Sequence, residues 1–223
     1  MLDELQGLIE QAGLIGGLAV NTRLFRGRLH EKTKVCDTWT ALGPPPSELA
    51  PSNRMSAAGI SVFYGSLDPA TAKAEIVVNH DPTDQRVITM ATWINTRPVT
   101  VLDLVNVPPL PEFFASDRYD REPLIFLREF VPTITQPVQH DGREPIEYVP
   151  TQILTEYFRH RYTLGENRDR IDAILYPSAQ RRRGRNIVVF ADHSSLAPDP
   201  YDIQPQPVLS LVPGSFRRLR IKR

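Results

Sequence analysis

A single glutamate stands out among the side chains of this sequence that can do chemistry. Glu75 lies in the stretch ATAKAEIVV (residues 70–78), where none of the residues three or four positions away is basic. Residues at that spacing are neighbours on a helix surface, so no local ion pair accounts for the carboxylate. A carboxylate among small and apolar groups is costly unless a distant group compensates it. Glu75 is therefore either a functional carboxylate or an exposed helix glutamate.

An arginine and a tyrosine upstream of Glu75 have side chains suited to a charged molecule that contains a ring. Arg54 lies in SNRMSAAGI, and its planar guanidinium can fork onto a phosphate or a carboxylate. Tyr64 lies in SVFYGSL and can stack on a planar ring. The alternatives are a surface loop arginine and a half-buried strand tyrosine, both of which are common in proteins.

The pattern of apolar and turn-forming residues predicts the elements that must position these three side chains. Asp68 and Pro69 suit the N-cap and the first position of a helix that runs to residue 78 and carries Glu75. Residues 61–67 read as a strand, and the proline-rich residues 43–51 read as a loop. Further helices are predicted over 2–14, 118–131 and 149–161, and further strands over 22–29, 86–94, 98–104, 172–176, 186–190, 206–212 and 216–221. The elements follow no regular βαβ rhythm, which favours an α+β fold.

The composition argues against several classes of protein. Lys+Arg and Asp+Glu both count 26, which is unlike a protein that coats nucleic acid or an anionic membrane. The single cysteine, Cys36, suits a reducing compartment. The five histidines stand alone and no CxxC or HExxH motif occurs, so we expect no metal site. The acidic start of the chain and the lack of a run of roughly 18 apolar residues predict a soluble, cytoplasmic protein.

Several stretches, taken in order, resemble the RES domain, a family named for an arginine, a glutamate and a serine. The first half carries LFRGR, GPPP and then NRMSAAGISVFYGSLDPATAKAE, in which Tyr64 precedes Glu75 by 11 residues and Arg54 precedes it by 21. The second half, IDAILYPSAQRRRGRNIVVF, is similar to the family's later block. That block places the family's serine at Ser178 and an asparagine that starts the next strand at Asn186.

The resemblance implies a fold and an activity. RES domains resemble ADP-ribosyltransferase toxins, so we expect an ADP-ribosyltransferase-like core of mixed, mostly antiparallel sheets flanked by helices. It further implies that NAD is consumed as a substrate by cleavage of its nicotinamide–ribose bond, with no cofactor. No GxGxxG motif for a bound redox dinucleotide occurs. Many members are toxins silenced by a helix-turn-helix antitoxin of the Xre type, so such a partner is expected.

The resemblance also implies roles for individual residues. The carboxylate of Glu75 would stabilise an oxocarbenium-like ribose and orient a nucleophile, and Tyr64 would wall the nicotinamide side. Arg54 would hold the pyrophosphate or an incoming phosphate. Ser178 would hydrogen-bond either Glu75 or the ribose hydroxyls. These four residues are the expected catalytic set, and the expected substrate-binding residues are Arg26, Arg28 and Asn186.

Compared with the family, residues 1–223 read as one RES-type domain with three additions. They are an N-terminal helix at 1–20, an inserted middle segment at 79–147 and a C-terminal extension at 191–223.

Two other functions stay open at this point. A protein-modifying mono-ADP-ribosyltransferase would use the same site. A module that binds nucleic acid or a protein partner would instead use the basic turn QRRRGR, residues 180–185. The balanced net charge favours a solvated turn between two strands for this segment.

Overall fold

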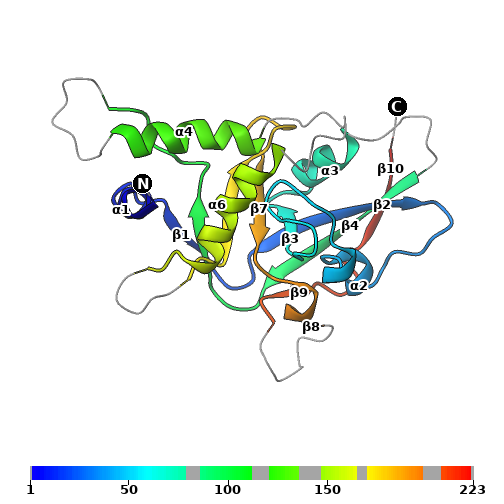
Figure 1. The fold of residues 1–223 in the computed structure, drawn as a ribbon. Coiled ribbons are helices and arrows are strands. Elements are labelled where there is room, and N and C mark those ends of the chain that lie inside the picture. The colour runs from blue at the N-terminus through cyan, green and yellow to red at the C-terminus, as the bar shows by residue number, and fades with distance from the viewer. Residues whose placement is uncertain are drawn as a thin grey trace.

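The computed structural model describes residues 2–78, 86–111, 121–135, 147–164, 170–197 and 207–221 (Figure 1). The helices in these ranges are α1 (Leu2–Gln11), α2 (Trp39–Leu42), α3 (Pro69–Val77), α4 (Arg121–Thr135) and α6 (Val149–His160), with short 3₁₀ helices at Ser47–Leu49 and His193–Ser195. The strands are β1 (Ile15–Leu18), β2 (Arg23–Glu31), β3 (Phe63–Ser66), β4 (Arg86–Asn95), β5 (Val99–Asp103), β6 (Ala173–Pro177), β7 (Arg185–Val189), β8 (Leu196–Ala197), β9 (Leu209–Leu211) and β10 (Arg217–Arg220).

The ten strands form one sheet. Its order is β1-β5-β6-β7-β3-β2-β4-β9-β8, and β10 pairs with β4 beside β9. Only β5 with β6 and β8 with β9 are parallel, and the other pairs are antiparallel. The predicted α+β fold with a mixed, mostly antiparallel sheet is therefore confirmed. The strands β4 and β5 of the segment 79–147 pair inside this sheet, as do β8 to β10 of the segment 191–223.

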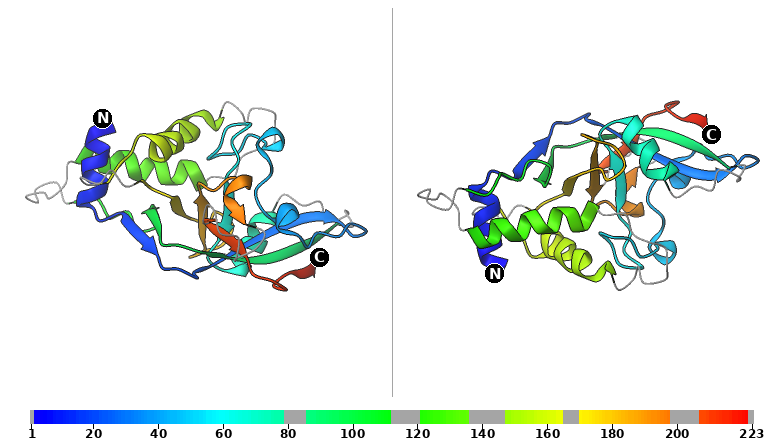
Figure 2. Two further views of the ribbon diagram at one scale, coloured as in Figure 1. Left: turned by 90° about the horizontal axis from the view of Figure 1, so that it is seen from below. Right: turned by 90° about the horizontal axis from the view of Figure 1, so that it is seen from above.

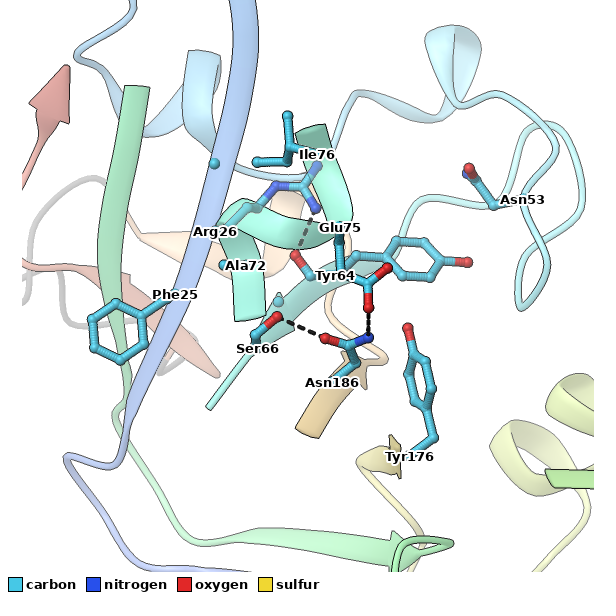
Figure 3. A pocket seen from close by; sticks show the side chains of 12 residues that line it. Phe25, Arg26, Asn53, Tyr64, Ser66, Ala72, Glu75, Ile76, Tyr176 and Asn186 are labelled. Carbon is cyan, nitrogen blue, oxygen red and sulfur yellow. Dashed lines mark hydrogen bonds between the residues drawn. The ribbon is translucent and has the colours of Figure 1, made fainter. Parts of the chain in front are cut away.

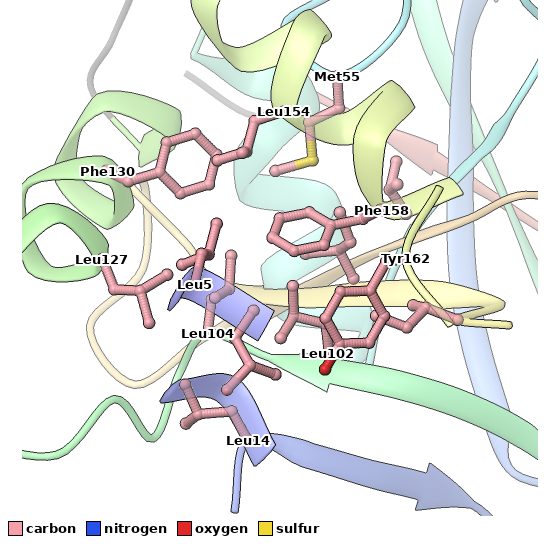
Figure 4. Packing of buried hydrophobic residues seen from close by; sticks show 14 of the residues in the cluster. Leu5, Leu14, Met55, Leu102, Leu104, Leu127, Phe130, Leu154, Phe158 and Tyr162 are labelled. Carbon is pink, nitrogen blue, oxygen red and sulfur yellow. The ribbon is translucent and has the colours of Figure 1, made fainter. Parts of the chain in front are cut away.

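The alternation of side chains along the strands divides the core between the two faces of the sheet. Ile174 and Val188 pack on one face with α1, α4 and α6, in the cluster drawn in Figure 4. Leu175 and Ile187, their neighbours in sequence, pack on the other face around the buried Trp93. Figure 2 shows α1 and β10 at opposite ends of the molecule. Both faces of the central strands are buried, which fixes their register.

The helix α3 begins as its sequence predicts. The Asp68 carboxylate accepts hydrogen bonds from the backbone N–H groups of Ala70 and Thr71, at 3.1 and 2.9 Å, and Pro69 takes the first helical position. Ala72 packs against Ile88 of β4. The cap and this packing hold the helix over the sheet, with Glu75 near its C-terminal end.

The structure corrects several sequence-based boundaries. The N-terminal helix ends at Gln11 and does not fill residues 1–20, because Gly13 takes a left-handed conformation (φ 63°) and Ile15–Leu18 pairs with β5. The predicted helix 118–131 is α4, Arg121–Thr135, which continues through Pro132; residues 118–120 lie outside the described residues. The strands β1 and β8 and the short helix α2 were not predicted. No helix in the described part of the chain is long and apolar enough to cross a membrane.

Candidate active site

A row of paired residues across four strands forms the floor of a cavity. Tyr176 of β6 pairs with Asn186 of β7, Asn186 with Ser66 of β3, and Ser66 with Phe25 of β2. Paired residues point to the same face of a sheet, and α3 lies over this face with Glu75 above the row (Figure 3). The cavity has a volume of about 340 Å³, and its polar lining includes Arg26, Asn53, Tyr64, Ser66, Glu75, Tyr176 and Asn186.

The Glu75 carboxylate is held through one of its two oxygens. Ser178 Oγ donates to Glu75 Oε1 at 2.5 Å, and Asn186 Nδ2 donates to the same oxygen at 2.6 Å. Ser66 Oγ donates to Asn186 Oδ1 at 2.7 Å, which turns the amide N–H groups of Asn186 towards Glu75. No hydrogen bond to Oε2 occurs within the described residues. The carboxylate is thus fixed in place with one oxygen available to a ligand.

The hydroxyl of Ser178 is oriented by the turn that contains the basic segment. The backbone N–H groups of Gln180 and Arg181 both donate to Ser178 Oγ, at 3.2 and 3.1 Å. These bonds occupy the acceptor positions of the hydroxyl, so its proton points to Glu75. Of the two partners that the sequence suggested for Ser178, Glu75 is the one it contacts. Its role in catalysis stays a prediction.

Arg26 brings a positive charge to the same cavity. Its guanidinium donates to the backbone carbonyls of Leu42, at 3.1 Å, and Tyr64, at 2.7 Å. Burial lowers the pKa of Arg26 to about 10, so the side chain is charged at neutral pH. Among the described residues no carboxylate lies within ion-pair distance of it. A cation without an acidic partner at a cavity wall suits an anionic ligand.

Tyr64 joins the cavity to the turn before it in the sequence. Its hydroxyl accepts from the backbone N–H of Met55 and shares a hydrogen bond with Ser56 Oγ, both at 3.2 Å. Burial raises the pKa of Tyr64 to about 12. Since the turn occupies this hydroxyl, Tyr64 presents its ring to the cavity, in keeping with a wall against a planar group.

A second, more apolar cavity adjoins the first. It has a volume of about 280 Å³ and shares Arg26, Asn53 and Tyr64 with the cavity around Glu75. The rest of its lining is mostly apolar, with Pro45, Ala50, Pro51, Ile60 and Val62. One cavity therefore offers hydrogen-bonding groups, and its neighbour offers a surface suited to a flat ring.

Three predicted site residues do not line either of these cavities: Ser178, which contacts Glu75, and the arginines Arg54 and Arg28. The guanidinium of Arg54 donates to the carbonyl of Thr133 on α4 and lies over the ring of Tyr148, 5.6 Å from its centroid. Burial lowers the pKa of Arg54, and the neighbouring Tyr148 opposes that effect. Arg28 is exposed, donates to the Ala41 carbonyl at 2.7 Å and borders a different cavity. Their roles in binding stay predictions.

Three polar residues of the cavity lining were not predicted from the sequence: Asn53, Ser66 and Tyr176. A tyrosine inside a short apolar strand is typical of a sheet, and nothing in IDAILYPSAQ marks it as functional. The signal that could have found it is its place two residues before Ser178, near the end of the strand that leads to that serine.

The basic turn makes contacts of its own. Arg181 Nη1 forms an ion pair with Asp68, at 2.7 Å, and donates to Thr71 at the start of α3. Arg182 and Arg183 are exposed. The turn thus ties the Ser178 hairpin to the helix that carries Glu75. No group of three or more His, Cys, Asp or Glu side chains suited to a metal occurs in the described ranges.

Comparison with known proteins gives the family. A family model of the RES domain matches residues 23–210, which extend from the first residue of β2 into β9. The match covers most of the chain, so the protein belongs to the RES domain family, whose members are commonly NAD-related toxins. No curated protein matches the chain. The resemblance drawn from the sequence is confirmed.

Proposed function

We propose that this protein is an enzyme that cleaves the bond between nicotinamide and ribose in NAD. The observation that carries the proposal is that Glu75 and Arg26, of opposite charge, line one cavity without pairing with each other. NAD offers a matching pattern, a ribose that becomes cationic on cleavage and an anionic pyrophosphate. Membership of the RES family and the adjoining apolar cavity support the same assignment.

Glu75 is the group that would stabilise the transition state. As the bond between ribose C1′ and nicotinamide N1 breaks, its electron pair goes to the ring nitrogen, which loses its positive charge. The ribose then carries the positive charge as an oxocarbenium-like species. A carboxylate fixed in advance stabilises this charge without reorganisation, and it needs no proton from a general acid, since nicotinamide leaves as a neutral molecule.

The other polar groups would bind the substrate. Arg26 provides a positive charge for the pyrophosphate, together with the Nη2 donors, which make no hydrogen bond to the described residues, and the ring of Tyr64 provides a wall for a planar group. Asn186 and Ser178 act through Glu75 and fix its orientation. Arg28 and Arg54 are proposed as further contacts for phosphate groups. NAD is in this account a substrate and not a cofactor.

The acceptor of the ribosyl group decides the exact reaction. Water gives ADP-ribose and a proton, inorganic phosphate gives ADP-ribose-1″-phosphate, and a protein side chain gives a modified protein. The test is to incubate pure protein with NAD, with and without phosphate, and to separate the products by chromatography. Release of nicotinamide supports the proposal, whichever acceptor is found. Unchanged NAD after incubation with a folded protein contradicts it.

A protein that destroys NAD needs control, and we extend the proposal to a toxin held inactive in the cytoplasm by a partner. A helix-turn-helix antitoxin would block the site by inserting an acidic segment or a C-terminal carboxylate near Arg54. Expression of the chain alone should then slow growth and deplete NAD, and the Glu75→Gln form should be harmless. Normal growth and normal NAD with the wild-type chain would contradict the toxin role.

A further inference from the structure

The hydroxyl of Tyr176 faces the cavity and has no hydrogen-bond partner among the residues that the structure describes. Tyr176 precedes Ser178 by two residues and pairs across the sheet with Asn186, so it belongs to the same row as Asn186, one of the two groups that hold Glu75. Figure 3 shows its hydroxyl directed towards the Glu75 carboxylate. No hydrogen bond from this hydroxyl to any described residue occurs. The phenol is half-buried, and a polar group in such a place normally has a partner.

The chemistry around Tyr176 restricts what that partner can be. Ser178 and Asn186 already occupy Oε1 of Glu75, which leaves Oε2 as an acceptor. Burial raises the pKa of Tyr176 above its ordinary value, so the phenol keeps its proton and is available as a donor. A ligand group placed between Oε2 and the phenol must therefore donate to one and accept from the other. A hydroxyl group does both.

We infer that Tyr176 is a further substrate-binding residue, whose hydroxyl donates to a ribose hydroxyl that itself donates to Glu75 Oε2. The inference rests on the proposed function and names the substrate group that Tyr176 and Glu75 recognise together. The ribose next to the breaking bond is the one that Glu75 must approach, and its 2′-hydroxyl is adjacent to C1′. The pair Tyr176–Glu75 would thus set the position of C1′ beside the carboxylate.

The experiment is a double-mutant cycle between Tyr176 and the ribose hydroxyl. We would measure kcat/KM of the wild type and of Tyr176→Phe with NAD and with the analogue that lacks the 2′-hydroxyl on the nicotinamide ribose. With NAD the variant should lose about 5- to 10-fold, the size of one hydrogen bond. With the analogue it should lose less than about 2-fold, because the partner of the phenol is already gone.

Tyr162→Phe is the matched control. The Tyr162 hydroxyl is also without a hydrogen-bond partner in the described residues, but it lies in the core beside Phe158, away from the cavity. This variant should turn over both substrates like the wild type. Thermal unfolding of all three proteins would show that each folds.

The outcomes separate this inference from the proposed function. If the wild type is active and Tyr176→Phe loses kcat/KM equally with NAD and with the analogue, the hydroxyl contact is overturned and the proposed function is not. The same conclusion follows if Tyr176→Phe loses no kcat/KM with either substrate. A wild type that releases no nicotinamide would overturn the proposed function. In that case the contact between Tyr176 and the ribose hydroxyl would be tested by calorimetry of ADP-ribose binding. Equal affinities of the wild type and Tyr176→Phe for ADP-ribose would overturn the contact.

Discussion

Ser178 Oγ lies 2.5 Å from Glu75 Oε1, although the two residues are 103 positions apart in the chain. One comes from the turn between β6 and β7 and the other from α3, so the sheet and the helix must both be in place before the pair forms. This contact joins two of the three residue types for which the RES family is named. It also explains how a carboxylate near the end of a helix is kept in one orientation.

Replacing Ser178 by alanine tests this orienting role. The substitution removes a hydrogen bond to a charged group, and such bonds contribute about 1.5–3 kcal/mol. If Glu75 must be fixed for catalysis, kcat/KM for NAD should fall about 10- to 100-fold, with kcat carrying most of the loss. Ser47→Ala, at an exposed serine that lines neither cavity, is the control and should behave like the wild type. A kcat unchanged in Ser178→Ala would show that the contact only serves the fold.

Arg26→Lys tests the proposed clamp for the pyrophosphate. Lysine keeps the charge, but it lacks the planar fork that reaches the Leu42 and Tyr64 carbonyls together. We expect the KM for NAD to rise by about 10-fold, with a smaller change in kcat. Arg23→Lys, at an exposed position on the same strand, should leave KM unchanged. Steady-state kinetics of the three proteins measures these changes. An equal KM for NAD in the wild type and Arg26→Lys would show that Arg26 does not bind the substrate.

Asp68→Ala tests the start of the helix that carries Glu75. Loss of an N-cap costs about 1 kcal/mol, so the free energy of unfolding should fall by about that amount at neutral pH. Burial acts to raise the pKa of Asp68, but the hydrogen bonds from Thr71 and the charge of Arg181 outweigh it and lower this pKa below its ordinary 3.8.

The lowered pKa fixes the sign of a pH effect. A carboxylate whose pKa is lower in the folded than in the unfolded chain stabilises the fold fully above the ordinary value, and loses this effect as the pH falls through the folded value. The stability difference between the wild type and Asp68→Ala should therefore shrink below about pH 4. Denaturant unfolding at several pH values measures it, with the exposed Asp37→Ala as control. A difference that stays constant down to pH 2 would contradict this account.

The sequence predicted Glu75, Tyr64, Ser178 and Asn186 as members of one site, and the structure does bring these four residues together. Their order and spacing matched the RES family, and the N-cap at Asp68 placed Glu75 on a helix. The direction of the Arg54 side chain could not be predicted, because the carbonyl that accepts its hydrogen bond belongs to Thr133, 79 residues away in the chain.

Tyr176 was missed for a similar reason, since its importance comes from pairing with Asn186 across the sheet. Strand registers of this kind depend on packing between distant segments and leave no local pattern. The strand β1, with the sequence IGGL, was missed because two glycines weaken any strand signal, and its pairing with β5 decides its structure. Local signals thus predicted the longer helices and the longer strands, and tertiary pairing decided the position of the others.

The most direct test of the central claim compares nicotinamide release from NAD by the wild type and by Glu75→Gln. Glutamine keeps the shape of the side chain and an oxygen that can accept from Ser178, but it removes the negative charge. The account predicts that the wild type releases nicotinamide and that the variant, with the same thermal unfolding midpoint, is slower by about 100-fold or more. Equal rates of release by the two proteins would contradict the claim that the Glu75 charge drives the cleavage.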